Sequence, residues 1–123
     1  MEEELLEYSL RGYCCSQIVI DMGLRKMGRE NQDMVEAAAG LCFGLNQGQN
    51  CGIVTAAMML IFLHDPQEAR LSRARDFYEW FEGTFGSIEC NELLEGNPIN
   101  KAQKCPMMIE AAMTELGDIL EWD

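Results

Sequence analysis

The sequence predicts an all-α fold, a single compact bundle of about five to six helices around a central apolar helix. Only three prolines occur, and β-branched residues form no sustained alternating run of the kind that is typical of strands. Apolar residues instead recur at helical spacing through most of the chain. The chain has 123 residues and no linker, repeat or low-complexity tract, so residues 1–123 are expected to form one helical domain.

Small residues delimit the first three expected helices. Residues 3–10 predict a short first helix, which ends at Gly12. A second helix is expected over residues 14–27, with Gly28 as its stop. A third is expected over residues 31–44, and its first residue, an asparagine, is the predicted N-cap. The side chains expected to face inward on the second and third helices are Ile18, Val19, Met22, Met34, Ala38, Leu41 and Leu45.

The fourth expected helix, over residues 51–63, is the central one, because its sequence is apolar on every face. Asp65 and Pro66 supply an N-cap and a first-turn proline for a fifth helix that ends near residue 85. The side chains expected to face inward on this fifth helix are Leu71 or Ala74, Phe77, Tyr78 and Phe81.

A short turn of helix and one long helix are expected in the remaining chain. The short turn begins at Cys90, and Asn97-Pro98 then breaks the chain. The last helix is expected over residues 106–122, because proline is favoured at the first helical position. Its inward stripe is expected to contain Ile109, Met113, Leu116 and Leu120.

Charge and hydropathy exclude several classes of partner. The formal net charge of −12 argues against nucleic acid, since phosphate binding needs clustered Lys and Arg. The first four residues, MEEE, are the reverse of a basic signal-peptide start. The longest apolar run, residues 52–63, is shorter than the roughly 20 residues that span a bilayer, so no membrane insertion is expected. We therefore expect a cytoplasmic protein, whose thiols are mostly reduced.

Four of the six cysteines stand where a helix is expected to begin, namely Cys15, Cys51, Cys90 and Cys105. A helix start offers free N–H groups and a partial positive charge, and both favour thiolate over thiol. We expect the four sulfurs to gather in one catalytic site. Cys51 and Cys105 are the expected thiolates, with Cys15 and Cys90 as resolving or partner thiols.

Placement at a helix start supports redox and metal chemistry equally, because a thiolate is also the form that binds a metal ion, and spacing helps to separate the two. The chain has no CxxC, the pair typical of zinc ribbons and of thioredoxin-like centres. In a metal-binding protein, Cys15, Cys51, Cys90 and Cys105 would hold Zn or an iron–sulfur centre from four separate helices. In a third interpretation the chain is a non-catalytic helical interaction module whose cysteines pack as small hydrophobes.

The other two cysteines show weaker signals. Cys14 and Cys15 are adjacent, and their Cα separation of about 3.8 Å is shorter than the separation that a disulfide needs. Only one of the two is therefore expected to point into the site. Cys42 lies in an apolar stretch of the third expected helix, so we interpret it as a buried thiol.

Three segments and one cysteine carry a family resemblance. Residues 12–17, GYCCSQ, resemble a G-x-N-C-A-Q segment, and residues 48–57, GQNCGIVTAA, resemble a glycine-rich loop followed by C-G-A-x-T-G-A. Residues 87–94, SIECNELL, resemble a C-x-E-L-L segment, and Cys105 resembles a last cysteine that opens the final helix. In this order they resemble the redox-active proteins named for their C_GCAxxG_C_C cysteine pattern.

The resemblance covers most of the chain, from about residue 12 to residue 116. It implies an all-helical domain with four grouped cysteines and a redox activity, and it supplies no substrate. The chain departs from the pattern at Cys14, which replaces a usual asparagine, and at Ile53 and Ala56, which replace small residues.

The preferred hypothesis is a thiol/disulfide redox protein, which would make it a thiol-dependent oxidoreductase. This activity requires no cofactor, and its partner would be a redox protein or a small-molecule thiol or disulfide. A zinc or iron–sulfur protein and a non-catalytic interaction module remain the alternatives.

Overall fold

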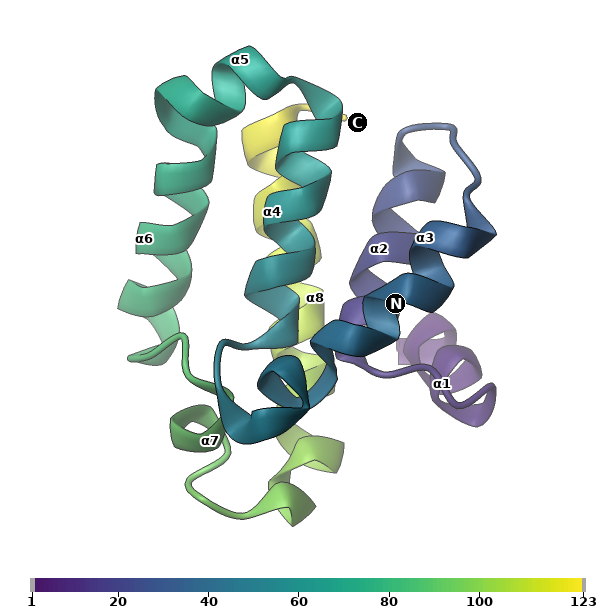
Figure 1. Ribbon diagram of the computed structural model, residues 1–123, viewed down its shortest axis with the longest axis vertical. Helices are drawn as coiled ribbons and strands as arrows, with labels where there is room; N and C mark the ends of the chain where they lie inside the picture. Colours follow the sequence, from purple (N-terminus) through teal and green to yellow (C-terminus); the bar gives the residue numbers. More distant parts are fainter. Residues whose placement is uncertain (1, 123) are drawn as a thin grey trace.

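The computed structural model describes residues 2–122, so the first and last residues of the expected 1–123 domain lie outside it. The fold is all-α, as predicted (Figure 1). No strand forms within residues 2–122, where a single antiparallel bridge pairs Asn50 with Glu89. The helices are α1 (Glu2–Leu10), α2 (Cys15–Lys26), α3 (Gln32–Ala37), α4 (Gly52–His64), α5 (Pro66–Glu68), α6 (Ala74–Phe85), α7 (Cys90–Leu93) and α8 (Lys101–Leu120). Shorter 3₁₀ or π turns occupy Ala38–Leu41, Gly44–Gly48, Ala69–Arg73 and Pro98–Asn100.

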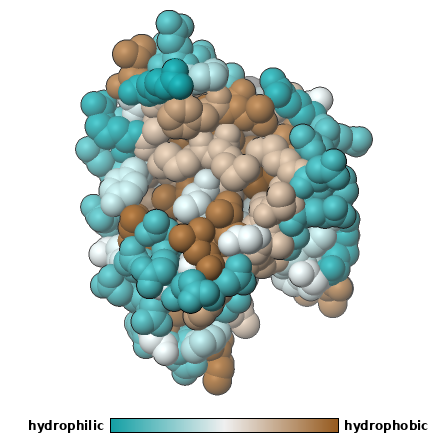
Figure 2. Space-filling view, in the orientation of Figure 1, coloured by the Kyte–Doolittle hydropathy of each residue, from teal (hydrophilic) through white to brown (hydrophobic). Residues whose placement is uncertain are grey.

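Helix α4 is the central helix, as predicted, and packs against α2, α6 and α8 (Figure 1). Its contact with α2 is close because a Cβ at Gly23 would overlap the Leu60 side chain. One side of α4 nevertheless reaches the surface, since Met59 is 38% exposed and Phe62 is 36% exposed. Figure 2 shows apolar surface near the middle of this face of the molecule. The expectation of a helix surrounded on every side is therefore met only in part.

The third expected helix ends earlier than predicted. Helix α3 starts at the predicted N-cap, where the Asn31 side chain accepts a hydrogen bond from the N–H of Met34 at 3.0 Å. A 3₁₀ turn follows α3, after which Cys42 is extended and Phe43 is left-handed, with φ 49°. Leu45, expected in the core, is 43% exposed. Residues after this break therefore do not continue the helical spacing that the sequence predicted for one continuous helix.

The fifth expected helix is built from α5, a π turn and α6. It begins as predicted, with the Asp65 carboxylate accepting hydrogen bonds from two backbone N–H groups of the first turn. Phe77 and Phe81 are wholly buried and Ala74 packs against the core, as expected, but Tyr78 is 38% exposed and Leu71 is 69% exposed. A π turn inserts an extra residue and rotates the helical face, so Ala69 is buried in place of Leu71.

Helix α8 begins five residues before the predicted start, and Pro106 lies inside it. Asn97 caps the preceding 3₁₀ turn by accepting a hydrogen bond from the N–H of Ile99 at 3.0 Å, and this turn leads directly into the helix. Pro106 lacks an N–H and leaves out one bond of the helix, which continues beyond it. The four side chains of the predicted inward stripe are all buried.

Among the helices of residues 2–122, none is both long and apolar enough to cross a membrane.

Candidate functional site

The four predicted cysteines come from four separate segments and lie together. Cys15 is the first residue of α2, Cys51 immediately precedes α4, and Cys90 is the first residue of α7. Cys105 lies on α8, and its thiol is hydrogen-bonded to the Cys15 sulfur. Cys51 and Cys90 are close enough to both of these sulfurs for their charges to interact. All four are free thiols.

The prediction that each of the four stands at a helix start is wrong for Cys105. Because α8 begins at Lys101, Cys105 lies one turn inside the helix, where backbone N–H groups are already bonded along the helix. Its pKa is raised, first by donating a hydrogen bond to Cys15 and then by burial. Cys105 is therefore a thiol and a donor, and the expectation of a thiolate here is not met.

Cys15 has the surroundings that favour a thiolate most strongly. The Cys105 thiol donates a hydrogen bond to its sulfur, and the backbone N–H groups of Ser16 and Phe43 donate further bonds. Lys101 adds a nearby positive charge. Led by the Cys105 hydrogen bond, these groups outweigh burial and lower the pKa of Cys15 to about 7. The thiolate expected at Cys51 and Cys105 is thus favoured at Cys15 instead.

Cys51 and Cys90 lie deeper, with 3% and 6% exposure. Burial raises the pKa of Cys51 to about 12, although the N–H groups at the start of α4 favour its thiolate. Burial also raises the pKa of Cys90. For these two residues desolvation dominates over the helix start, which the sequence alone does not show.

Backbone hydrogen bonds hold Cys51 and Cys90 on neighbouring segments. The Cys51 N–H donates to the Ile88 carbonyl at 2.7 Å, and the Cys90 N–H donates to the Gln49 carbonyl at 2.7 Å. These two bonds flank the bridge between the loop before α4 and the segment before α7. The glycine-rich loop and the C-x-E-L-L-like segment of the sequence therefore form one unit of the site.

Gly52 provides a close backbone approach in the glycine-rich loop. A Cβ at this position would lie 2.7 Å from the Leu41 carbonyl oxygen and 3.2 Å from the Cys15 sulfur. The glycine therefore makes room for the sulfur of Cys15.

A cavity of about 350 Å³ opens onto Cys15 and Cys105. Tyr13 and Lys101 are among the residues that line it, and Cys51 and Cys90 are not. Cys15 and Cys105 are thus the members of the group that a molecule in this cavity can reach.

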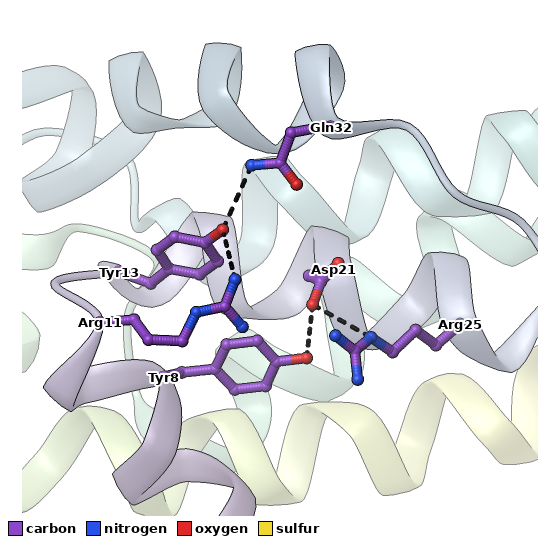
Figure 3. A network of polar contacts seen from close by, with 6 residues as sticks. All are labelled: Tyr8, Arg11, Tyr13, Asp21, Arg25 and Gln32. Atoms are coloured by element: carbon purple, nitrogen blue, oxygen red, sulfur yellow. Dashed lines mark hydrogen bonds and ion pairs between the residues drawn. The ribbon is translucent and has the colours of Figure 1, made fainter.

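A polar network fixes the segment that leads to the site, where α1 crosses α2 (Figure 3). The Tyr8 hydroxyl donates to Asp21 on α2 at 2.6 Å, and Arg25 pairs with the same carboxylate at 3.2 Å. The Arg11 guanidinium donates to the Tyr13 hydroxyl at 3.1 Å and lies over the Tyr13 ring. These contacts tie α1, which contributes Leu5 and Ser9 to the cavity, to the start of α2.

The structure contains a feature that the sequence analysis missed, a disulfide between Cys14 and Cys42 with a Cα separation of 6.0 Å. Cys42 is not a buried thiol in mid-helix, because α3 and its 3₁₀ turn end before it. The sequence offered one signal, the glycines at positions 40 and 44, which indicate a possible helix break on either side of Cys42.

The metal-binding alternative receives no geometric support. Within residues 2–122, no three His, Cys, Asp or Glu side chains are grouped so that they could hold a metal ion.

Comparison with protein families identifies the chain. Residues 13–119 match the family described as "Putative redox-active protein (C_GCAxxG_C_C)". No curated protein and no solved structure matches the chain significantly. The matched region contains all four grouped cysteines and spans most of the sequence. The chain therefore belongs to the C_GCAxxG_C_C family.

Proposed function

We propose that this protein is a cytoplasmic thiol/disulfide oxidoreductase in which Cys15 is the attacking thiolate and Cys105 the resolving thiol. The observation that carries the proposal is that both residues line the same cavity, with the Cys105 thiol close enough to Cys15 to lower its pKa. A substrate disulfide in this cavity would meet a thiolate and, beside it, the second thiol needed to complete the reduction.

The two electrons of the reaction come from these two residues alone, and the two protons come from Cys105 and from solvent. The Cys15 thiolate attacks one sulfur of the substrate disulfide, the substrate S–S bond breaks, and one substrate half leaves as a thiol after taking a proton. Cys105 then loses its proton and attacks the Cys15 sulfur of the mixed disulfide, so the other half leaves as a second thiol. The substrate gains two electrons and two protons, and Cys15 and Cys105 are joined by a disulfide.

The change in charge at Cys15 favours the second step. While Cys15 is a thiolate, its negative charge and hydrogen bond keep the pKa of Cys105 raised. Once Cys15 is in a mixed disulfide, this charge is gone, and the pKa of Cys105 falls. Cys105 is thereby activated only after Cys15 has reacted.

Cys51 and Cys90 would act as the partner pair behind the cavity. Their charge interactions with Cys15 and with each other support this assignment, as does the backbone unit that holds them together. In this role they would return a second pair of electrons to the Cys15–Cys105 disulfide.

Disulfide mapping tests the proposal. Protein purified under anaerobic conditions, with its thiols reduced, is treated with one equivalent of oxidised glutathione, and the products are mapped by peptide mass spectrometry. The expected first disulfide within the chain is Cys15–Cys105. Cys105→Ser should stop the reaction at the glutathione adduct of Cys15, whereas the matched variant Cys90→Ser should still form the Cys15–Cys105 bond. A first disulfide that excludes Cys15, or near-stoichiometric zinc or iron in the isolated protein, would contradict it.

A further inference from the structure

The Cys14–Cys42 disulfide joins the two backbone segments that hold the Cys15 sulfur. Cys14 is the N-cap of α2 and directly precedes Cys15. Cys42 directly precedes Phe43, whose N–H donates a hydrogen bond to the Cys15 sulfur. The disulfide therefore fixes the loop that carries one of the donors to the thiolate.

Ser16 shows how closely the disulfide and the Cys15 sulfur are connected. Its backbone N–H donates to the Cys15 sulfur. Its side-chain hydroxyl is buried, donates to the Ala38 carbonyl at 2.7 Å, and contacts the sulfurs of Cys14 and Cys42 at 3.2 and 3.3 Å. One residue thus touches both sulfurs of the disulfide and the neighbouring thiolate.

Phe43 adopts a conformation that must be held in place. It has φ 49°, in the left-handed region that side chains other than glycine rarely adopt, and Leu45 and Asn46 behind it have φ 61°. A loop of this kind persists only where surrounding contacts fix it. The covalent bond at Cys42 lies at the residue directly before Phe43.

We propose that the Cys14–Cys42 disulfide is a redox-sensitive positioning element, which when closed holds the Phe43 amide against the Cys15 sulfur and when reduced releases it. This inference rests on the proposed function, because it regulates the same thiolate. Cys14 and Cys42 act through Cys15 and take no part in the exchange reaction itself.

A dithiol reductant would break the Cys14–Cys42 disulfide. One of its thiolates attacks the Cys14 sulfur, which lines the cavity, so that the Cys14–Cys42 bond breaks and Cys42 leaves and takes up a proton. The second thiol of the reductant then attacks the reductant sulfur that is bonded to Cys14. This closes the reductant into a ring and releases Cys14 as a thiol. Two electrons and two protons pass to Cys14 and Cys42, and the reductant leaves as its cyclic disulfide.

The charged and titratable groups around Cys15 lie outside the loop that Cys42 tethers. Cys105 and Lys101 approach it from α8, Cys51 from the start of α4, and Cys90 from α7. A difference between the open and closed states is therefore assigned to the two backbone donors beside the disulfide, Ser16 and Phe43, which amide hydrogen exchange distinguishes.

The test compares the wild-type protein with the double variant Cys14→Ser/Cys42→Ser, which lacks the disulfide. The rate of iodoacetamide alkylation at Cys15 is measured against pH by peptide mass spectrometry. The wild-type midpoint is expected at about pH 7. In the variant it should rise by only part of the interval to the ordinary thiol value of about 8.5, because the Cys105 hydrogen bond and the Lys101 charge are retained. An unchanged midpoint in a folded variant would overturn the proposal.

If the double variant fails to fold, the wild-type protein with its Cys14–Cys42 disulfide reversibly reduced provides a second test. Amide hydrogen exchange by NMR should then show faster exchange at Phe43, while amides in α6 keep their rates. Equal protection of the Phe43 amide in the oxidised and reduced protein would also overturn the proposal.

The two proposals fail separately. If Cys15 never forms a disulfide with Cys105 in either state, the proposed function fails, and the comparison of midpoints still decides whether the Cys14–Cys42 bond controls Cys15. If the midpoint does not move but the Cys15–Cys105 bond forms, only the positioning element is refuted.

Discussion

The positive charge of Lys101 favours the thiolate at two of the cysteines, Cys15 and Cys90. Lys101→Met keeps the length of the side chain and removes this charge. The fraction of Cys15 present as thiolate at pH 7 should fall roughly two- to threefold, because the pKa of Cys15 rises. The midpoint of the alkylation profile at Cys15 measures this change.

Lys104 offers a matched control on the same helix. Its ammonium donates to the Leu93 carbonyl at 3.1 Å and pairs with Glu95 at 3.1 Å. Lys104→Met should therefore leave the midpoint at Cys15 in place. Equal shifts in the two lysine variants would mean that net charge, and not the position of Lys101, sets the pKa.

Gly52 is a residue at which added volume would press on the Cys15 sulfur. Gly52→Ala would place a Cβ against the Leu41 carbonyl and the Cys15 sulfur, so we expect a loss of about 1–3 kcal/mol in the free energy of unfolding. Gly83→Ala is the control, since it lies in α6 with open space around it and should stabilise by about 0.4–1 kcal/mol. Urea denaturation measures both, and a neutral Gly52→Ala would contradict the close approach.

The sequence predicted which cysteines lie together but not which one carries the charge. Helix starts pointed to Cys51 and Cys105, whereas the lowered pKa belongs to Cys15. The main groups that lower this pKa, the Cys105 thiol and then the Lys101 charge, come from a segment remote in sequence, and the burial of Cys51 is set by the whole fold. The chemical roles of the four cysteines stay predictions.

At the scale of elements, Pro106 distinguishes the observed α8 from the helix predicted from the sequence. In the structure it lies in the helix interior, where it leaves out the bond to the Ala102 carbonyl. Pro106→Ala should therefore raise the free energy of unfolding by about 1–2 kcal/mol, after the greater freedom of the unfolded chain is included. If the helix began at Pro106, as the sequence indicated, the same change would be neutral or destabilising. Thermal and urea denaturation decide between the two.

Element boundaries were predictable where a side chain caps the backbone locally. The starts of α3 and α5 follow from Asn31 and Asp65, and the structure confirms both caps. The break after α3 and the π turn before α6 were not predictable in the same way. Both depend on tertiary contacts, such as the disulfide at Cys42 and the burial of Ala69. Because these two features were not predicted, Leu45 and Leu71 were expected to be buried, whereas both are exposed.

At the scale of the whole molecule, the fold class and the central helix were predictable because apolar periodicity reports them directly. The order in which the helices pack was not, since the same apolar stripes allow several arrangements. That packing brings α2, α7 and α8 around the start of α4, and it therefore determines the site. A helical family with four remote cysteines can be recognised from sequence, but its reactive pair requires the structure.

The central claim is that one shared site makes these four thiols unequal, and site-resolved alkylation measures this most directly. The rate of alkylation is followed against pH at Cys15, Cys51, Cys90 and Cys105 in a single sample of folded protein. The account predicts a midpoint of about 7 at Cys15, and midpoints above the ordinary thiol value of about 8.5 at the other three. Four thiols that titrate independently near 8.5 would contradict it.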